Sequence, residues 1–153
     1  MTDIVTPETR SRMMAGIRDK NTKPELSIRK LLHGKGFRYR LHDRKLPGKP
    51  DIVLPRYSAV ILIHGCFWHG HDCHLFRLPS TRTDFWKTKI DRNRHNDSSA
   101  IDSLSKSGWR VATVWECALR GKFRLEDALI ADSLAVWIRS TDMFLELLGT
   151  SSY

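Results

Sequence analysis

The spacing of apolar residues predicts two helices in the first third of the chain. The first, over residues 7–18, is short and basic, so only one side of it suits packing. The second, over residues 22–34, opens with Thr22 and Glu25 three positions apart, the spacing of a capping box. Gly34 has the position of a residue that ends a helix. The sequence therefore predicts this second helix.

Three strands follow in the pattern. Residues 37–41 alternate apolar with basic side chains, which is typical of a half-buried strand. The Pro- and Gly-containing segment 46–50 cannot continue it, so Asp51–Leu54 forms a new strand directly after a rigid turn. Residues 59–64 include a continuous apolar run, as in a central strand covered on both faces. The short link between the last two strands predicts that they pair antiparallel.

The second half of the chain predicts a loop, a long helix, a strand and a closing helix. Residues 65–79 are irregular. Thr81 with Asp84 is expected to cap a long helix that ends near Ser107-Gly108. That strand, residues 109–115, follows a helical crossover and is therefore expected to be parallel to its neighbour. A helix over residues 124–139 completes an α/β fold with a mixed central sheet flanked by helices.

Length and charge refine this picture. A chain of 153 residues fits one domain, which we place at residues 21–140, after a basic arm at 1–20 and before a tail at 141–153. Residues 1–50 contain 13 basic and 5 acidic side chains, against a formal charge of +9 for the whole chain. Such polarisation favours a polyanionic partner over a merely solvated surface, although the second interpretation stays open.

No apolar run has the length of a membrane span, and the first nine residues do not have the apolar run of a secretory signal. The sequence therefore predicts a cytoplasmic protein without a membrane partner.

Cysteine and histidine gather in residues 64–74, which contain two of the three cysteines and four of the seven histidines. Structural zinc sites use four Cys or His ligands, and Cys66, Cys73 and the distant Cys117 supply three thiolates. His71 is our choice for the fourth ligand, with His74 as the alternative. Three unrelated reduced cysteines are the other interpretation. A closed site has no position for a reacting water, so this zinc is expected to be structural.

His64 and His69 then remain beside a strand end, on the side where we expect Asp51. A carboxylate and a main-chain carbonyl at Ile63 are oxygen ligands of the kind that magnesium prefers. Imidazole accepts a proton from an attacking water near neutral pH, and Asp97 on the long helix is placed to orient such a water. The ordinary alternatives are that Asp51 caps a turn and that Asp97 faces solvent.

Aromatic residues occupy the same region. Phe67 and Trp68 lie inside the Cys/His segment, and Trp86 follows in the first turn of the long helix. Burial in a core is the ordinary interpretation. A glycine- and histidine-rich loop buries few such rings, however, and aromatic wedges enter base stacks, most easily at a mismatched step.

Several spaced motifs together resemble the very short patch repair (Vsr) DNA mismatch endonucleases. The match covers about residues 8–138 and rests on the segments Leu46–Asp51, His64–His69, Thr81–Thr83 with Phe85–Trp86, and Val114–Gly121. The resemblance implies a restriction-endonuclease-like fold with a structural zinc site. It further implies magnesium-dependent nicking of double-stranded DNA on the 5′ side of the thymine in a T:G mismatch, which arises when 5-methylcytosine deaminates.

The resemblance also implies a role for each candidate residue. Asp51 resembles the family's magnesium ligand, His69 its general base, and His64 and Asp97 its groups that hold metal-bound waters; Glu25 resembles a further active-site carboxylate. By the same resemblance the zinc ligands are Cys66, His71, Cys73 and Cys117. The intercalating residues it implies are Phe67, Trp68 and Trp86, with Met14 and Ile17 of the basic arm in the opposite groove.

One departure from the wider nuclease fold concerns the pair Ile63-His64, which stands where that fold often has an acidic residue and a lysine. The Vsr subgroup replaces that pair and commonly has threonine at position 63. Isoleucine binds a metal only through its backbone oxygen and offers no hydroxyl hydrogen bond.

Two other functions compete with the nuclease. A zinc-stabilised DNA-binding module without catalysis needs only the basic arm, and a zinc hydrolase of a small substrate needs an open zinc site. The resemblance implies a monomer acting at the bacterial nucleoid. It leaves open recruitment by other DNA repair proteins, the number of catalytic metal ions and the bases that flank the mismatch.

Overall fold

The computed structural model describes residues 22–150, so the helix expected over residues 7–18, with Met14 and Ile17, lies outside the described residues. The described chain forms one mixed sheet with the strand order β1-β2-β3-β4-β5. In chain order its elements are α2 (Lys23–Gly34), β1 (Arg40–Leu41), β2 (Ile52–Leu54), the short 3-10 helix η1 (Pro55–Tyr57), β3 (Ala59–His64), α3 (Thr83–Lys106), β4 (Arg110–Trp115), α4 (Glu116–Leu119), α5 (Asp127–Arg139) and β5 (Phe144–Leu147).

The sheet combines both pairing directions. β1, β2 and β3 pair antiparallel, whereas β3, β4 and β5 pair parallel. Each parallel neighbour is reached through a helix, α3 before β4 and α5 before β5, because a parallel pair needs a crossover. The antiparallel pairing predicted for the strands at 51–54 and 59–64, and the parallel strand predicted at 109–115, are both confirmed, each to within one residue of its bounds.

Helix α2 begins as its sequence predicts. The backbone N–H of Glu25 donates to the side-chain oxygen of Thr22 at 3.4 Å, and Pro24 stands in the first turn. One side of the helix buries Ile28 and Leu32, which pack against the sheet. This packing stabilises the helix, because twelve residues alone form a marginal helix in water.

Three predicted elements differ in extent. The strand expected over 37–41 shrinks to Arg40–Leu41, both exposed, although Phe37 is buried. The cap expected from Thr81 and Asp84 is absent: Arg82 occupies the N-cap with φ 54, and Thr83 donates its hydroxyl to the carbonyl of Pro79 instead. The closing helix starts at 127, not 124.

Three elements were not predicted, namely the short helices η1 and α4 and the strand β5. β5 lies within the segment expected to be a tail and adds a parallel edge strand to the sheet. Burial alternates along it, with Leu145 and Leu147 turned inward, but the exposed Phe144 is apolar, so residue type alternates only over the last three positions.

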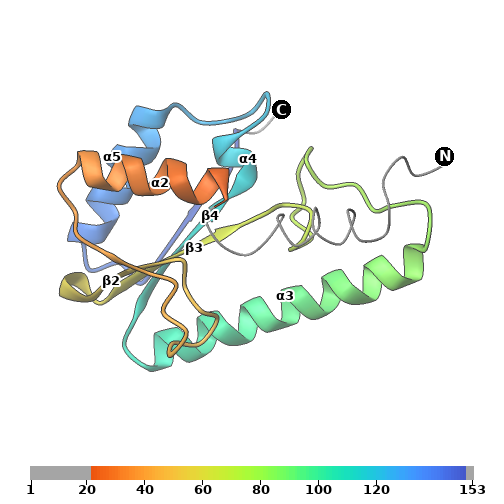
Figure 1. Ribbon diagram of the computed structural model, residues 1–153, viewed down its shortest axis with the longest axis horizontal. Coiled ribbons are helices and arrows are strands. Elements are labelled where there is room, and N and C mark those ends of the chain that lie inside the picture. The colour runs from red at the N-terminus through yellow and green to blue at the C-terminus, as the bar shows by residue number, and fades with distance from the viewer. Residues whose placement is uncertain (1–21, 151–153) are drawn as a thin grey trace, which may run out of the picture.

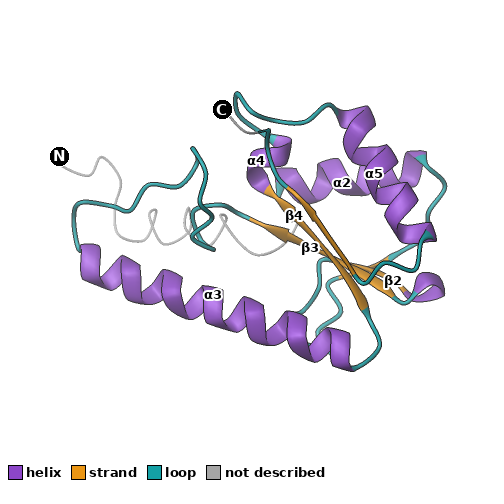
Figure 2. Cartoon of the chain, turned by 180° about the vertical axis from the view of Figure 1, so that it is seen from behind, coloured by secondary structure: helices purple, strands orange, loops and turns teal. Residues whose placement is uncertain are grey.

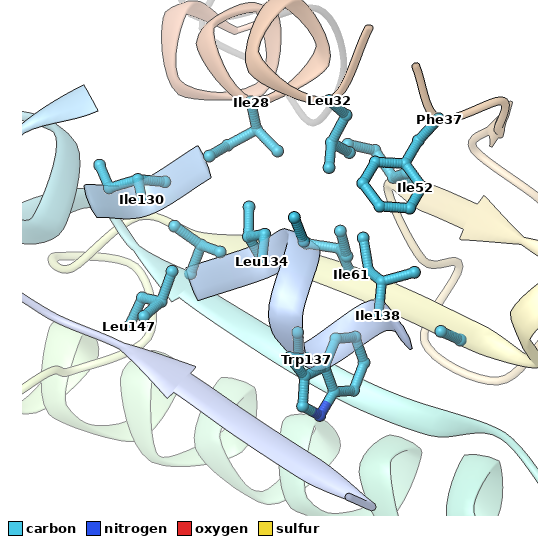
Figure 3. Close-up of a cluster of buried hydrophobic side chains, with 14 of the residues drawn as sticks. Ile28, Leu32, Phe37, Ile52, Ile61, Ile130, Leu134, Trp137, Ile138 and Leu147 are labelled. Carbon is cyan, nitrogen blue, oxygen red and sulfur yellow. The ribbon is translucent and has the colours of Figure 1, made fainter. Parts of the chain in front are cut away.

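Helices cover both faces of the sheet (Figure 1, Figure 2). α2, α4 and α5 lie on one face, where Ile28, Ile61, Leu134 and Ile138 belong to one buried cluster (Figure 3). On the other face Leu104 of α3 packs with Val60 and Leu62 of β3 in a second cluster. The N-terminal part of α3 and the loop before it extend beyond the sheet (Figure 2).

The alternation along β3 determines where the chemistry lies. Ala59 and Ile61 face the α2 side and Val60 and Leu62 the α3 side. Continuing this alternation, Ile63 packs against the α2-side core, whereas His64 approaches Asp97 of α3. The last two residues of β3 therefore point to opposite faces of the sheet.

Candidate active site

Three groups of side chains in the described part of the chain have the donor atoms and the proximity of metal ligands. Within each group, one donor atom from every member lies within 4.8 Å of the others. We name them by their members: the four-ligand group, Cys66, His71, Cys73 and Cys117; the histidine group, His64, His69 and Asp97; and the acidic group, Glu25, His42 and Asp51.

The four-ligand group has the dimensions of a tetrahedral site. The Nδ1 atom of His71 lies 3.6 Å from the sulfur of Cys66 and 3.6 Å from that of Cys117. Zinc bonds of about 2.3 Å to sulfur and about 2.1 Å to nitrogen set sulfur–nitrogen separations of roughly 3.6 Å. His74, the alternative ligand, is exposed and rests instead against the ring of Phe123. The residues present therefore fit a zinc ion.

Backbone N–H groups surround the sulfurs. Those of Cys117 and Gly149 donate to the sulfurs of Cys66 and Cys117, each at 3.3 Å. Burial raises the pKa of both thiols, so a cation is needed to hold the buried sulfurs as thiolates at neutral pH. The group joins the loop after β3 to α4 and to the segment after β5, three parts that are distant in sequence.

The histidine group lies on the α3 side of the sheet. Nδ1 of His69 is hydrogen-bonded to Oδ2 of Asp97, and Nε2 of His64 lies 4.0 Å from Oδ1 of the same carboxylate. The two imidazole rings stack with centroids 3.9 Å apart and an angle of 8° between their planes. Burial, reinforced by the neighbouring His69, lowers the pKa of His64 to about 4. His64 is therefore neutral at physiological pH.

A pocket of about 430 Å³ opens beside this group. It lies between the ends of β3 and β4 and one side of α3, and its lining includes His64, His69, Asp97, Arg94 and Trp115. The lining combines the Arg94 guanidinium with the carboxylates of Asp72, Asp97 and Glu146, so charges of both signs face this space.

The acidic group centres on Asp51, directly before β2. Its Oδ2 accepts the backbone N–H of Ile63 at 2.7 Å. Burial, reinforced by the charge of Glu25, raises the pKa of Asp51 to about 7, against the lowering effect of that hydrogen bond. Glu25 itself accepts from His42 at 2.9 Å and from Arg29 at 3.2 Å. Buried carboxyls gathered in this way suit a hard divalent cation.

The predicted catalytic residues thus fall into two groups near the end of β3, and not on the one side of the sheet that we expected. Asp51 belongs to the acidic group and His64 and His69 to the histidine group. The link is the bond from Asp51 to Ile63, because Ile63 directly precedes His64. Asp97 does more than face solvent, since it accepts the His69 bond.

Two residues of this region were missed by sequence reasoning, His42 and Trp115. His42 follows the alternating segment 37–41, which is the signal that places it beside the next strand. Trp115 stacks on His71, with centroids 4.0 Å apart, and its ring edge contacts His64 at 5.2 Å. One tryptophan thus separates the four-ligand group from the histidine group.

An aromatic cluster extends from the Cys/His loop to the start of α3. Phe67, Trp68 and Trp86 contact one another with centroids 5.2 to 5.9 Å apart, and all three are only half-buried. The side chain of Asn93 donates to the carbonyl of Trp68 at 2.8 Å. Lys89 lies 5.8 Å from the Trp68 ring. The cluster is therefore an aromatic surface with a cationic border, outside both buried cores.

The fold and these groups define an α/β protein with candidate metal-binding groups of two kinds, one rich in cysteine and the others in histidine and carboxylate. Residues 2–75 match the family model described as DNA mismatch endonuclease Vsr. The DNA mismatch endonuclease Vsr of Escherichia coli is 46% identical over 138 residues, covering 90% of this chain and 88% of the relative. The chain therefore belongs to the Vsr family of DNA mismatch endonucleases.

Two further relatives are named as nicking enzymes. The type II nicking enzyme V.XorIIP of Xanthomonas oryzae is 49% identical over 129 residues, covering 84% of this chain and 95% of the relative. The type II nicking enzyme V.NmeAIP of Neisseria meningitidis is 49% identical over 122 residues, covering 80% of this chain and 87% of the relative.

None of the helices between residues 22 and 150 combines the length and the apolar character that a membrane span requires.

Proposed function

We propose that this protein nicks double-stranded DNA on the 5′ side of the thymine in a T:G mismatch. The observation that carries the proposal is the meeting of two groups at the end of β3, with Asp51 bonded to Ile63 and the His69–Asp97 pair on the other face. A phosphodiester lying across this strand end contacts a carboxylate on one side and an imidazole on the other. Membership of the Vsr family supports DNA as the substrate.

In the proposed reaction His69 is the general base. Its Nδ1 is engaged by Asp97, which orients the ring and directs Nε2 toward a water that attacks the phosphorus. Asp97 is thereby a positioning residue as well as a neighbour of His64. His64 is neutral, so its ring stacks on that of His69 without adding a positive charge. Arg94 in the adjoining pocket meets the DNA backbone.

The acidic group is the proposed magnesium site. Asp51 and the main-chain carbonyl of Ile63 would bind the ion, with Glu25 as a further carboxylate beside them. Such an ion would stabilise negative charge at the phosphate during hydrolysis. The four-ligand group is the proposed structural zinc site. Its four side chains would complete a tetrahedral coordination and leave no position for a reacting water. Trp115 also stands between this group and the histidine group, so a role in bond cleavage is not expected.

The proposal also covers the fold family, the oligomeric state and the basic N-terminal segment. A mixed sheet with helices on both faces, and with Asp51 beside β3, supports a restriction-endonuclease-like fold. We propose a protein that acts as a monomer on nucleoid DNA, with the basic segment 1–20 as a DNA-contacting arm.

The decisive experiment is a strand-nicking assay. A labelled duplex with one T:G mismatch is expected to be cut once beside the thymine with magnesium, and to stay intact with EDTA. A matched T:A duplex of the same sequence is the control. A zinc-stabilised binding module would bind the mismatch and leave both strands intact in every lane, and that result would end the proposal.

Recognition of the mismatch is assigned to the aromatic cluster, as a wedge that enters the base stack. Trp68→Ala is expected to lower affinity for T:G DNA by about tenfold or more, because stacking on one base is worth about 1 to 3 kcal/mol. Affinity for matched DNA should fall less. Phe144→Ala, which removes a ring that is 56% exposed on β5, is the matched control. Equal losses on T:G and matched DNA, measured by fluorescence anisotropy, would contradict this role.

A further inference from the structure

His42 contacts both carboxyl residues of the acidic group. Its Nε2 lies 2.9 Å from Oε2 of Glu25, and its backbone N–H donates to the carbonyl oxygen of Asp51 at 3.1 Å. Glu25 belongs to α2 and Asp51 precedes β2, so the two carboxyls come from different elements. His42, directly after β1, therefore ties the helix to the strand at the point where the carboxyls meet.

The backbone of His42 adopts a conformation that side chains disfavour. Its φ is 48°, in the left-handed region, where Cβ approaches the following carbonyl oxygen. A glycine would adopt this φ without strain. The bond to Asp51 holds the turn, and the strained conformation carries the imidazole to Glu25. Unusual backbone of this kind is commonly kept where a side chain has a task at a site.

The contact between His42 and Glu25 is largely shielded from solvent. The Glu25 side chain is 4% exposed and that of His42 is 19% exposed. Arg29 donates to the same oxygen of Glu25, at 3.2 Å. In the tautomer with a proton on Nε2, His42 and Arg29 both donate to this oxygen, and Nη2 of Arg29 also lies 3.3 Å from Nε2 of His42. The directions of these contacts fix the plane of the carboxylate. Hydrogen bonds to charged groups are also among the stronger ones in a low-dielectric environment.

We propose that His42 is a positioning residue, which holds the Glu25 carboxylate beside Asp51 so that both face one divalent cation. This inference rests on the proposed function, in which that cation binds at Asp51. His42 acts through Glu25 and neither touches DNA nor transfers a proton.

Two substitutions separate this role from a merely structural one. His42→Gln keeps an N–H donor at a similar reach, whereas His42→Leu keeps the bulk and the left-handed strain but removes the donor. His33→Leu, an exposed position near the other end of α2, is the matched control. Binding of Mn²⁺ to the full-length, DNA-free protein, followed by electron paramagnetic resonance, reports the site independently of cleavage. Thermal melts establish that each variant is folded.

His42→Leu is expected to weaken Mn²⁺ binding about tenfold and to raise the half-saturating magnesium concentration for nicking by a similar factor, as befits one hydrogen bond to a charged group. In His42→Gln, Mn²⁺ affinity and the half-saturating magnesium concentration should both stay within about threefold of the wild-type values. His33→Leu should match the wild-type protein in both. The inference is overturned if His42→Leu lowers the melting temperature while Mn²⁺ affinity stays unchanged. It is also overturned if Gln and Leu weaken Mn²⁺ binding equally.

Failure of the proposed function gives a different result. A protein that never cuts T:G DNA, yet loses Mn²⁺ affinity in His42→Leu and recovers it in His42→Gln, retains the positioning role of His42 and loses only the nuclease assignment.

Discussion

Asp51→Asn is expected to abolish nicking, by about a thousandfold or more, while making the metal-free protein more stable at pH 8. The loss follows because asparagine is a poor ligand for a divalent cation, and several kcal/mol of transition-state stabilisation depend on that ion. The gain follows because the Asp51 carboxyl is buried near Glu25 with its pKa raised to about 7. Asparagine keeps an oxygen that accepts the Ile63 N–H but carries no charge.

The direction of the pH effect follows from proton binding. The unfolded chain ionises Asp51 near the ordinary pKa of 3.8, whereas the folded protein holds the proton until about pH 7. Between these values the folded state binds more protons, so stability falls as pH rises through this window and then levels off. At pH 8 the charged carboxylate costs about 4 kcal/mol in the metal-free protein, and Asp51→Asn removes that cost.

Urea unfolding between pH 4 and pH 8, with EDTA present, measures this difference. The two proteins should be nearly equal at pH 4, and the variant should be increasingly the more stable one toward pH 8. Adding magnesium should stabilise the wild-type protein but not Asp51→Asn, because an ion that binds only the folded state raises the free energy of unfolding. An Asp51→Asn protein that is less stable at pH 8 would show that the carboxylate serves the fold and not a cation.

Cys117→Ala is expected to abolish zinc binding at the proposed structural site and to lower the melting temperature by about 10 °C or more. Cys117 is 2% exposed and connects α4 to the loop that carries Cys66 and His71. Losing a structural metal removes the folding free energy coupled to its binding, commonly more than about 3 kcal/mol, and each kcal/mol shifts the melting temperature of a chain of this size by about 2 to 4 °C.

Elemental analysis and thermal melting check this prediction together. His71→Ala should behave as Cys117→Ala does, whereas His74→Ala, a change at the exposed neighbouring histidine, should keep both zinc and stability. A Cys117→Ala protein with normal melting and no nicking activity would instead indicate a catalytic zinc with an open site. Zinc retained in His71→Ala and lost in His74→Ala would reverse the choice of ligand.

Local sequence patterns predicted much of this fold. The capping pair Thr22 and Glu25 predicted where α2 begins, and the apolar run from Ala59 to His64 predicted β3 with the observed bounds. These signals succeed because capping and burial depend on residues that are close in the chain or on one face of one element. The spacing of Cys66, His71 and Cys73 in one loop similarly predicted a four-ligand site, and the structure brings Cys117 to it.

Other features depend on contacts between distant segments. Phe144–Leu147 was not recognised as a strand, because it has only four residues and the exposed apolar Phe144 hides the alternation of burial that the tertiary structure shows. The division of the candidate catalytic residues into two groups follows from the alternation of Ile63 and His64 across the sheet, together with the helix that covers each face. His42 carries only the weak signal of following the alternating segment 37–41, and its contact with Glu25 follows only from the tertiary turn after β1.

The sequence by itself determined the family, the order of most elements and the chemical types of the candidate ligands, since all of these follow from residue identity and short-range spacing. The tertiary structure decided which ligands share a site, because carboxylates and imidazoles act on one ion or one phosphate only within a few ångströms. That proximity is set by strand pairing and by the packing of α2 and α3 on opposite faces of the sheet.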